Sequence, residues 1–326
     1  MKNSGETTKK KFKLFDMNRD GKGVYEQENR KPTLGFFFKL FFRKFNQLLQ
    51  LNLLMLFMVI PFIVLLCIFI LGEKTPTVTD LTYAPIYGIN NVVGATGIQN
   101  ALDLTALQME VPVFSPVINV LIIAMFLALA LTWGWQNVGA AYVLRGLFRG
   151  DAVFVFGDYF YGIKRNMKQA FFLGLIDFIC SAVLILDFMF FYNLTGSFGF
   201  DFMYFMIFAL IIIWIMMRFY LYNLLITFNL KNFKILKNSL IFSILGIKRN
   251  IMAFLGILAL IILHVLLIFL ILPLGFAVAL ILPFVYILAA IGFMGTYAAY
   301  PVIERYMIEP YQNEQADTDA DTLDEL

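Results

Sequence analysis

Residues 251–303 read IMAFLGILALIILHVLLIFLILPLGFAVALILPFVYILAAIGFMGTYAAYPVI and contain no lysine, arginine, aspartate or glutamate. As one helix this stretch would extend ~80 Å at 1.5 Å per residue, whereas the hydrocarbon layer of a membrane is ~30 Å thick. Pro273 and Gly275 are the natural break, because both residue types favour a turn over a continued helix. The stretch therefore predicts a hairpin of two membrane-spanning helices, in which Pro283 kinks the second.

The rest of the 326-residue chain has the same apolar character. Apolar residues make up 61% of the chain, charged residues only 14%, and phenylalanine occurs 37 times. This balance excludes an ordinary soluble domain. We therefore expect an all-α, polytopic membrane protein with six transmembrane helices in three hairpins. The predicted spans are 48–71, 117–144, 170–194, 202–230, 251–272 and 276–303.

The basic residues predict the orientation of these helices. Of the 25 Lys and Arg residues, 23 fall on the side that holds both ends of the chain, the opposite side holds Lys74, and one lies within a span. Because loops rich in Lys and Arg stay in the cytoplasm, both termini are expected there. The chain then divides into a polar cytoplasmic segment (1–35), a membrane domain (36–311) with an extracytoplasmic loop (73–116), and an acidic tail (312–326). We expect this tail to be disordered and solubilising, rather than a partner-binding segment.

A five-residue motif occurs twice, each time directly before a predicted span. GIKRN at 162–166 recurs at 246–250, and FRKF at 42–45 is a weaker echo. An amphipathic stretch precedes each motif, so we interpret the chain as three units, each an interfacial elbow helix followed by a transmembrane hairpin. The alternative is that any helix start at the inner leaflet attracts basic residues. The basic elbow residues are expected to bind anionic lipid headgroups, and they are Arg43, Lys44, Lys164, Arg165, Lys248 and Arg249.

Short motifs around these junctions resemble one known family. They are NLL at 52–54 with Pro61, GAAYVLR at 139–145, DYF at 158–160 with Lys164, Asn166 with KQA at 168–170, GKGV at 21–24 and YMIEPY at 306–311. In these motifs the chain resembles the YesL family of bacterial integral membrane proteins, whose molecular function is unknown. The resemblance implies a place in the bacterial cell membrane and an association with oligosaccharide uptake, especially with ABC-type sugar importers. It implies no catalytic residues, and the 73–116 loop is an insertion relative to compact members.

Four ionisable side chains lie inside the predicted spans, namely Asp177, Asp187, Arg218 and His264. A charged group costs ~2.5–3.5 kcal/mol at a helix centre, so these residues indicate either a substrate or proton pathway or structural pairs, and we favour the pairs. Asp177 and Arg218 lie about 20 residues on either side of the short loop at 197–198, which predicts an ion pair at equal depth. Asp187 and His264 each lie about ten residues from an outer turn, which predicts a contact if their helices touch.

Other candidate sites are weaker. DMNRDG at 16–21 resembles the opening of a calcium loop, but position 12 of such a loop is Gln27 instead of glutamate, so we expect an Asx-type turn. A single histidine excludes a two-histidine metal site, and no hydrolase elbow or phosphate-binding loop is present. Gln136 and Asn137, near Gly134 and Gly139, indicate a close-packing helix face rather than a ligand site. We expect no metal, no cofactor and no nucleic-acid partner.

Three classes of function follow from these observations. The resemblance favours a non-enzymatic accessory or regulatory protein beside an ABC-type sugar permease. The alternative is a self-contained small-molecule transporter that uses the intramembrane Asp, Arg and His residues, since midplane polar groups and internal repeats are typical of transporters. A membrane enzyme is the least favoured class.

Overall fold

The computed structural model describes residues 32–71, 74–76, 110–112, 114–194, 197–271, 274 and 278–312. Apart from one pair of short antiparallel strands, the regular elements of these residues are helices. The elements are α1 (Leu34–Arg43), α2 (Phe45–Met55), η1 (Leu56–Met58), α3 (Ile60–Leu71), β1 (Lys74–Pro76), β2 (Glu110–Pro112), α6 (Pro116–Arg149), α7 (Val155–Asn193), α8 (Phe198–Thr227), α9 (Asn232–Leu245), α10 (Ile247–Ile271), α11 (Val278–Ile303) and the π-helical turn η3 (Glu304–Ile308). The calcium-like motif, most of the 73–116 loop and nearly all of the acidic tail lie outside the described residues.

Five helices are long and apolar enough to cross a membrane, namely α6, α7, α8, α10 and the helical stretch Leu282–Gln312 that contains most of α11. This confirms the expected helical fold with several helices of spanning length. The first predicted span, 48–71, is not one helix, because it divides into α2, η1 and α3. Pro61 has no N–H to donate to the carbonyl of Phe57, and its ring would clash with that carbonyl in a continuous helix. The chain therefore tightens into η1 and begins a new helix at Ile60.

The three predicted elbows are helical, but they differ in how they end. α1 and α9 are separate helices that end at Lys44 and Gly246. The middle elbow is the first part of α7, which runs on into the span through a kink at Asn166 (φ −117°, ψ 17°). The side-chain amide of Asn166 donates to the carbonyl of Gly162 (3.0 Å), a local bond that competes with regular helix geometry. Both copies of the GIKRN motif therefore change the direction of the chain.

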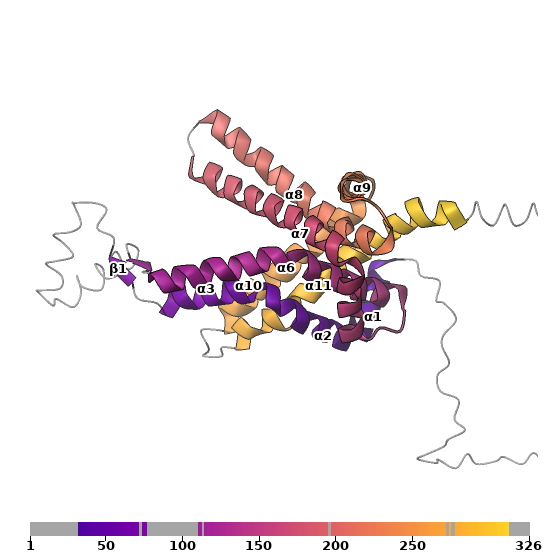
Figure 1. Ribbon diagram of the computed structural model, residues 1–326, viewed down its shortest axis with the longest axis horizontal. Helices are drawn as coiled ribbons and strands as arrows, with labels where there is room; N and C mark the ends of the chain where they lie inside the picture. Colours follow the sequence, from indigo (N-terminus) through magenta and orange to yellow (C-terminus); the bar gives the residue numbers. More distant parts are fainter. Residues whose placement is uncertain are drawn as a thin grey trace, which may run out of the picture.

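α11 lies at the centre of the helix packing. It contacts α2, α6, α8 and α10, while α6 packs along α7. The largest fully buried side chains, which include Leu51, Leu147, Tyr220 and Phe293, come from α1, α2, α6, α7, α8, α9 and α11. The first helix and the end of the last described helix lie at the same end of the molecule (Figure 1). The core is therefore concentrated near the helices that carry the elbows.

The outer part of the α7–α8 pair projects away from the other helices (Figure 1). We call this part, residues 178–193 and 198–215, the arm. Its two helices touch through the rings of Phe188 and Tyr204, whose centroids are 5.0 Å apart. Only one side chain of the arm is buried, that of Ile207, and it is still 6% exposed. Its surface is therefore left for lipid or for another protein.

α6 and α7 approach each other most closely at two glycines. A Cβ added to Gly134 would lie 1.8 Å from the carbonyl oxygen of Ala170, and one added to Gly174 would lie 2.1 Å from the Cα of Gly134. Backbone atoms cannot move aside as a flexible side chain can, so only glycine permits this contact. The close-packing face expected around Gly134 is confirmed.

We predict that Gly174→Ala lowers the melting temperature of the detergent-purified protein by several degrees. Alanine normally favours a helix over glycine by about 1 kcal/mol, but here its methyl group would force α6 and α7 apart. The matched control is Gly157→Ala, where an added Cβ meets only the Phe154 Cβ at 3.9 Å. The control should leave the melting temperature unchanged or slightly higher, and equal losses in both variants would contradict the close contact.

Candidate functional site

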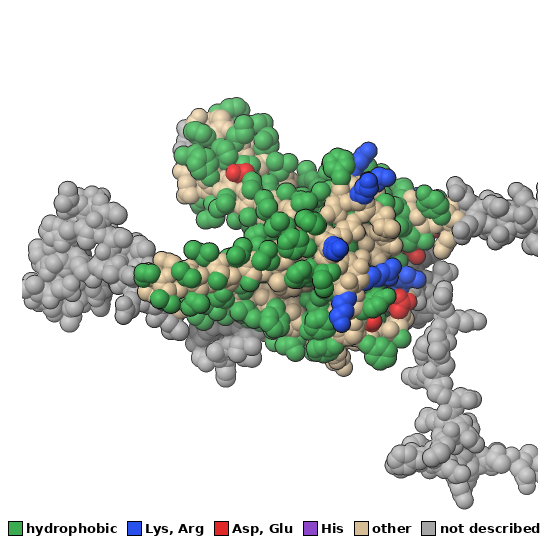
Figure 2. Space-filling view, in the orientation of Figure 1, with side chains coloured by type: hydrophobic (Ala, Val, Ile, Leu, Met, Phe, Trp, Pro, Cys, Tyr) green, Lys and Arg blue, Asp and Glu red, His purple; other side chains and the backbone are tan. Residues whose placement is uncertain are grey.

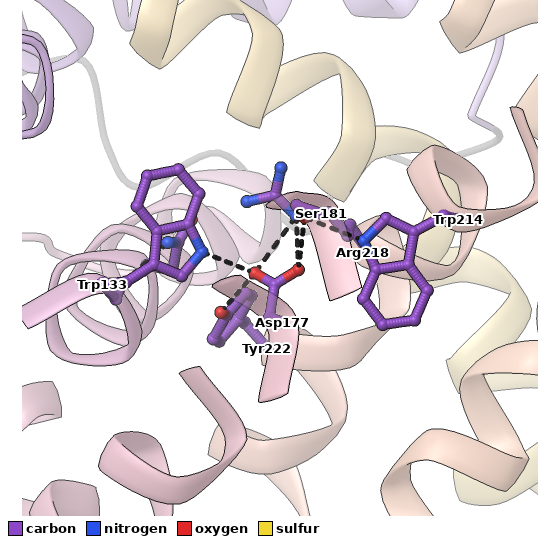
Figure 3. Close-up of polar contacts among 7 residues, drawn as sticks. Trp133, Asp177, Ser181, Trp214, Arg218 and Tyr222 are labelled. Carbon is purple, nitrogen blue, oxygen red and sulfur yellow. Dashed lines mark hydrogen bonds and ion pairs between the residues drawn. The ribbon is translucent and has the colours of Figure 1, made fainter. Parts of the chain in front are cut away.

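Asp177 lies on α7 at the base of the arm, where α7 faces both α6 and α8 (Figure 3). Its side chain is fully buried, at 0% exposed. The Nε of Arg218 on α8 lies 3.0 Å from Oδ1 of the carboxylate, and the arginine side chain is 30% exposed. The predicted ion pair between Asp177 and Arg218 is therefore present.

Two neutral groups donate hydrogen bonds to the same carboxylate. The indole Nε1 of Trp133 on α6 lies 2.8 Å from Oδ2, and the hydroxyl of Tyr222 on α8 lies 2.6 Å from it. Arg218 Nε also reaches Oδ2, at 3.2 Å, and its guanidinium carbon lies 5.2 Å from the centroid of the Trp133 ring. The carboxylate therefore connects α7 to both α6 and α8.

Ser181 extends this network by one turn along α7. Its hydroxyl lies 3.5 Å from Asp177 Oδ1 and accepts a hydrogen bond from the indole of Trp214 on α8 (3.0 Å). We call the whole group the Asp177 cluster, and its members are Trp133, Asp177, Ser181, Trp214, Arg218 and Tyr222 (Figure 3).

The cluster offsets a large desolvation penalty. Moving a carboxylate out of water costs several kcal/mol unless the charge is paired and its oxygens accept hydrogen bonds. Here one cation and several neutral donors meet both oxygens of Asp177. Because these oxygens are occupied, the carboxylate serves to hold three helices together. The group that remains available is the guanidinium of Arg218, whose two terminal nitrogens make no hydrogen bond with another described residue.

The predicted contact between Asp187 and His264 is wrong. His264 on α10 is buried, with its Nε2 3.0 Å from the hydroxyl of Tyr286 on α11 and its Nδ1 2.7 Å from the carbonyl of Leu260. Asp187 lies half-buried on the arm and makes no hydrogen bond or ion pair with the described part of the chain. Equal depth does not bring the two residues together, because α10 packs on α11 whereas α7 packs on α6 and α8.

A cavity of about 480 Å³ lies beside the Asp177 cluster, and we call it the central cavity. It is bounded by α6, α8 and α11, with side chains from α10 and from the broken α2–η1–α3 segment on other sides. Most of its wall is apolar. The polar side chains that line it are Asn137, Arg218, Tyr222, Asn223 and Thr296. Asn137, which we expected only on a packing face, therefore also faces a space that a ligand can occupy.

The six basic elbow residues lie at helix junctions, and Figure 2 shows basic side chains gathered towards one end of the molecule. None of the six makes an ion pair with another described residue. Burial, with a smaller contribution from the charge of Arg43, lowers the pKa of Lys44. The six basic elbow residues are Arg43 and Lys44 between α1 and α2, Lys164 and Arg165 before the kink in α7, and Lys248 and Arg249 at the start of α10.

Four members of the cluster were not predicted from the sequence, namely Trp133, Ser181, Trp214 and Tyr222. Tyr222 and Trp133 were missed for different reasons. Tyr222 follows Arg218 by one helical turn, so both side chains share a face, and this spacing was a usable signal. Trp133 belongs to α6, and nothing in the order of the helices indicates that its indole meets α7 at Asp177. The described residues contain no group of three or more His, Cys, Asp and Glu side chains that could hold a metal ion.

In comparisons with known proteins, the chain matches no family model, no curated protein and no solved structure. The YesL resemblance therefore stays an expectation that rests on the short motifs themselves. The site described above is defined by its own geometry.

We predict that Asp177→Asn and Arg218→Gln each destabilise the protein by ~3–5 kcal/mol, because each breaks a largely buried ion pair and leaves one charge without its partner. The double variant should recover part of the loss, which thermal unfolding in detergent can measure. Arg249→Gln, at a basic residue without an ion pair, is the control and should have little effect. Strictly additive losses from Asp177→Asn and Arg218→Gln would show that the two side chains do not interact.

Proposed function

We propose that the chain is a non-enzymatic protein of the bacterial cell membrane that crosses the bilayer six times with both ends in the cytoplasm. Five crossings are the helices of spanning length. The sixth is α2–η1–α3, which from Phe45 to Leu71 measures roughly 40 Å and so reaches across the hydrocarbon layer despite its break. The orientation is supported by the side on which 23 of the 25 Lys and Arg residues fall. In this arrangement the elbow residues face anionic lipid headgroups.

Within this topology the chain acts as an accessory or regulatory subunit beside an ABC-type oligosaccharide importer, the role that the YesL resemblance implies. The observation that carries this proposal is the arm, whose surface the rest of the described chain leaves uncovered (Figure 1). Large exposed side chains occur along both of its helices, among them Leu186, Phe190, Phe202 and Phe205. A helical pair of this kind provides a long contact surface for another membrane protein. A partner can bind there without disrupting the packing of the chain's other helices.

Asp187 adds a carboxylate, unpaired among the described residues, to this surface. It lies six residues before the end of α7, roughly 9 Å from that end, and has no partner in the described part of the chain. A carboxylate at membrane depth is costly unless it is paired. A Lys or Arg side chain on a helix of the importer's permease would offset this cost and fix the register of the contact.

We predict that permease subunits copurify with the tagged wild-type protein from cells grown on oligosaccharides and that Asp187→Asn reduces their recovery several-fold. Mass spectrometry identifies the subunits. Glu309→Gln, at an exposed residue outside the arm, is the matched control and should not change recovery. Recovery of permease subunits that is the same for all three proteins would contradict the role of Asp187, and their absence from the wild-type preparation would contradict the accessory function.

The alternative function is a self-contained transporter of small molecules, and the central cavity favours it. The break between α2 and α3 lies on the cavity wall, where Met55, Met58 and Val59 line it. Broken helices beside a polar site are typical of transporter binding sites. Solute flux into proteoliposomes that contain only this chain distinguishes the alternative from the accessory role, which produces no flux without the importer.

A further inference from the structure

The central cavity presents an unused donor on one wall. Arg218 bonds to Asp177 through Nε alone, and its two terminal nitrogens point away from the carboxylate (Figure 3). Guanidinium nitrogens donate hydrogen bonds and cannot accept them. A molecule in the cavity can therefore accept hydrogen bonds from Arg218 without disturbing the ion pair.

A second side chain in the wall of this cavity, that of Asn223, carries a buried acceptor without a described partner. Asn223 is only 4% exposed and lines the cavity. Its amide nitrogen lies 2.7 Å from the carbonyl oxygen of Phe219 and 3.5 Å from Thr296 Oγ1, and the contact with a carbonyl identifies this atom as the nitrogen. The amide oxygen has no hydrogen-bond partner among the described residues. Because a buried acceptor without a donor is unfavourable, an O–H or N–H group of a ligand is stabilised at this point.

Charge balance distinguishes between the possible ligands. Arg218 is the only charged side chain among the described residues that line the cavity, and its charge is balanced by its ion-pair partner Asp177. An anionic ligand would leave one negative charge uncompensated near Asp177 in a low-dielectric site. A cationic ligand would be repelled by Arg218. A neutral ligand preserves the balance.

We propose that the central cavity binds a neutral, hydroxyl-bearing small molecule, such as a sugar or polyol. Because a hydroxyl group both donates and accepts hydrogen bonds, neighbouring hydroxyls of one molecule can accept from Arg218 and donate to Asn223. The aromatic part of the wall, which includes Trp133 and Phe219, suits the C–H faces of such a molecule. This inference goes beyond the accessory role, because a permease can associate with the arm whether or not the cavity binds a ligand.

The test uses the full chain purified in octaethylene glycol monododecyl ether, a detergent without a sugar headgroup. Thermal unfolding is measured with glucose or maltose, and with gluconate or glucose 6-phosphate, each at tens of millimolar and at matched ionic strength. A ligand that binds only the folded state raises the melting temperature. We expect glucose or maltose to raise it by a few degrees and both anions to raise it less.

Asn223→Leu should abolish this shift, because leucine fills a similar volume but offers no acceptor. Gln136→Leu is the matched control, since Gln136 also carries a buried side-chain oxygen without a partner but lines a different cavity. The control should retain the full shift. If Asn223→Leu does not fold, Asn137→Leu on the facing helix α6 replaces it, and a smaller shift is expected.

Three results would overturn the proposal. The first is no shift with either neutral sugar. The second is a larger shift with gluconate or glucose 6-phosphate than with glucose, which would identify an anion site. The third is an unchanged shift in Asn223→Leu. None of these results bears on permease copurification, so failure of the cavity proposal and failure of the accessory function are separately visible.

Discussion

The buried carboxylate of Asp177 joins three helices at a single point, and the packing differs on either side of that point. Towards the elbows, α6, α7 and α8 enter the core, where Leu173 and Tyr220 are fully buried. Away from the elbows, α7 and α8 leave the other helices as the arm (Figure 1). A buried charge tolerates no loss of its partners, so the Asp177–Arg218 pair fixes where the arm begins and how α8 is oriented about its axis.

This orientation also determines what faces the central cavity. A short stretch of α8 carries Arg218, Tyr222 and Asn223. Arg218 and Tyr222 donate hydrogen bonds to Asp177, whereas Asn223 does not bind Asp177 and lines the cavity. Arg218 lines the cavity, and the two terminal nitrogens of its guanidinium are not used by the carboxylate. A structural ion pair and a ligand-binding surface can therefore share one arginine. The two interpretations of the intramembrane charges, as structural pairs or as a substrate site, do not exclude each other in this arrangement.

The sequence was sufficient for features that depend on length, composition and depth. Equal counts from a short loop placed Asp177 beside Arg218, because the two helices are joined directly. The same counting failed for Asp187 and His264, because depth says nothing about which helices are neighbours. The break before Pro61 was not predicted, because the apolar residues continue through it without a change in pattern. The break is caused by the backbone of this one proline, which has no N–H to donate. The unsatisfied oxygen of Asn223 depends on packing among three helices, which no pattern in the chain reveals.

The central claim is that α7 and α8 both cross the bilayer and carry the Asp177–Arg218 pair within it. Alkaline phosphatase is active only outside the cytoplasm, so fusions test this claim most directly. A fusion after Gly196, between the two helices, should be active, as should one after Thr96, whereas fusions after Lys237 or Tyr311 should be inactive. An inactive fusion after Gly196, or an active one after Lys237, would contradict the account.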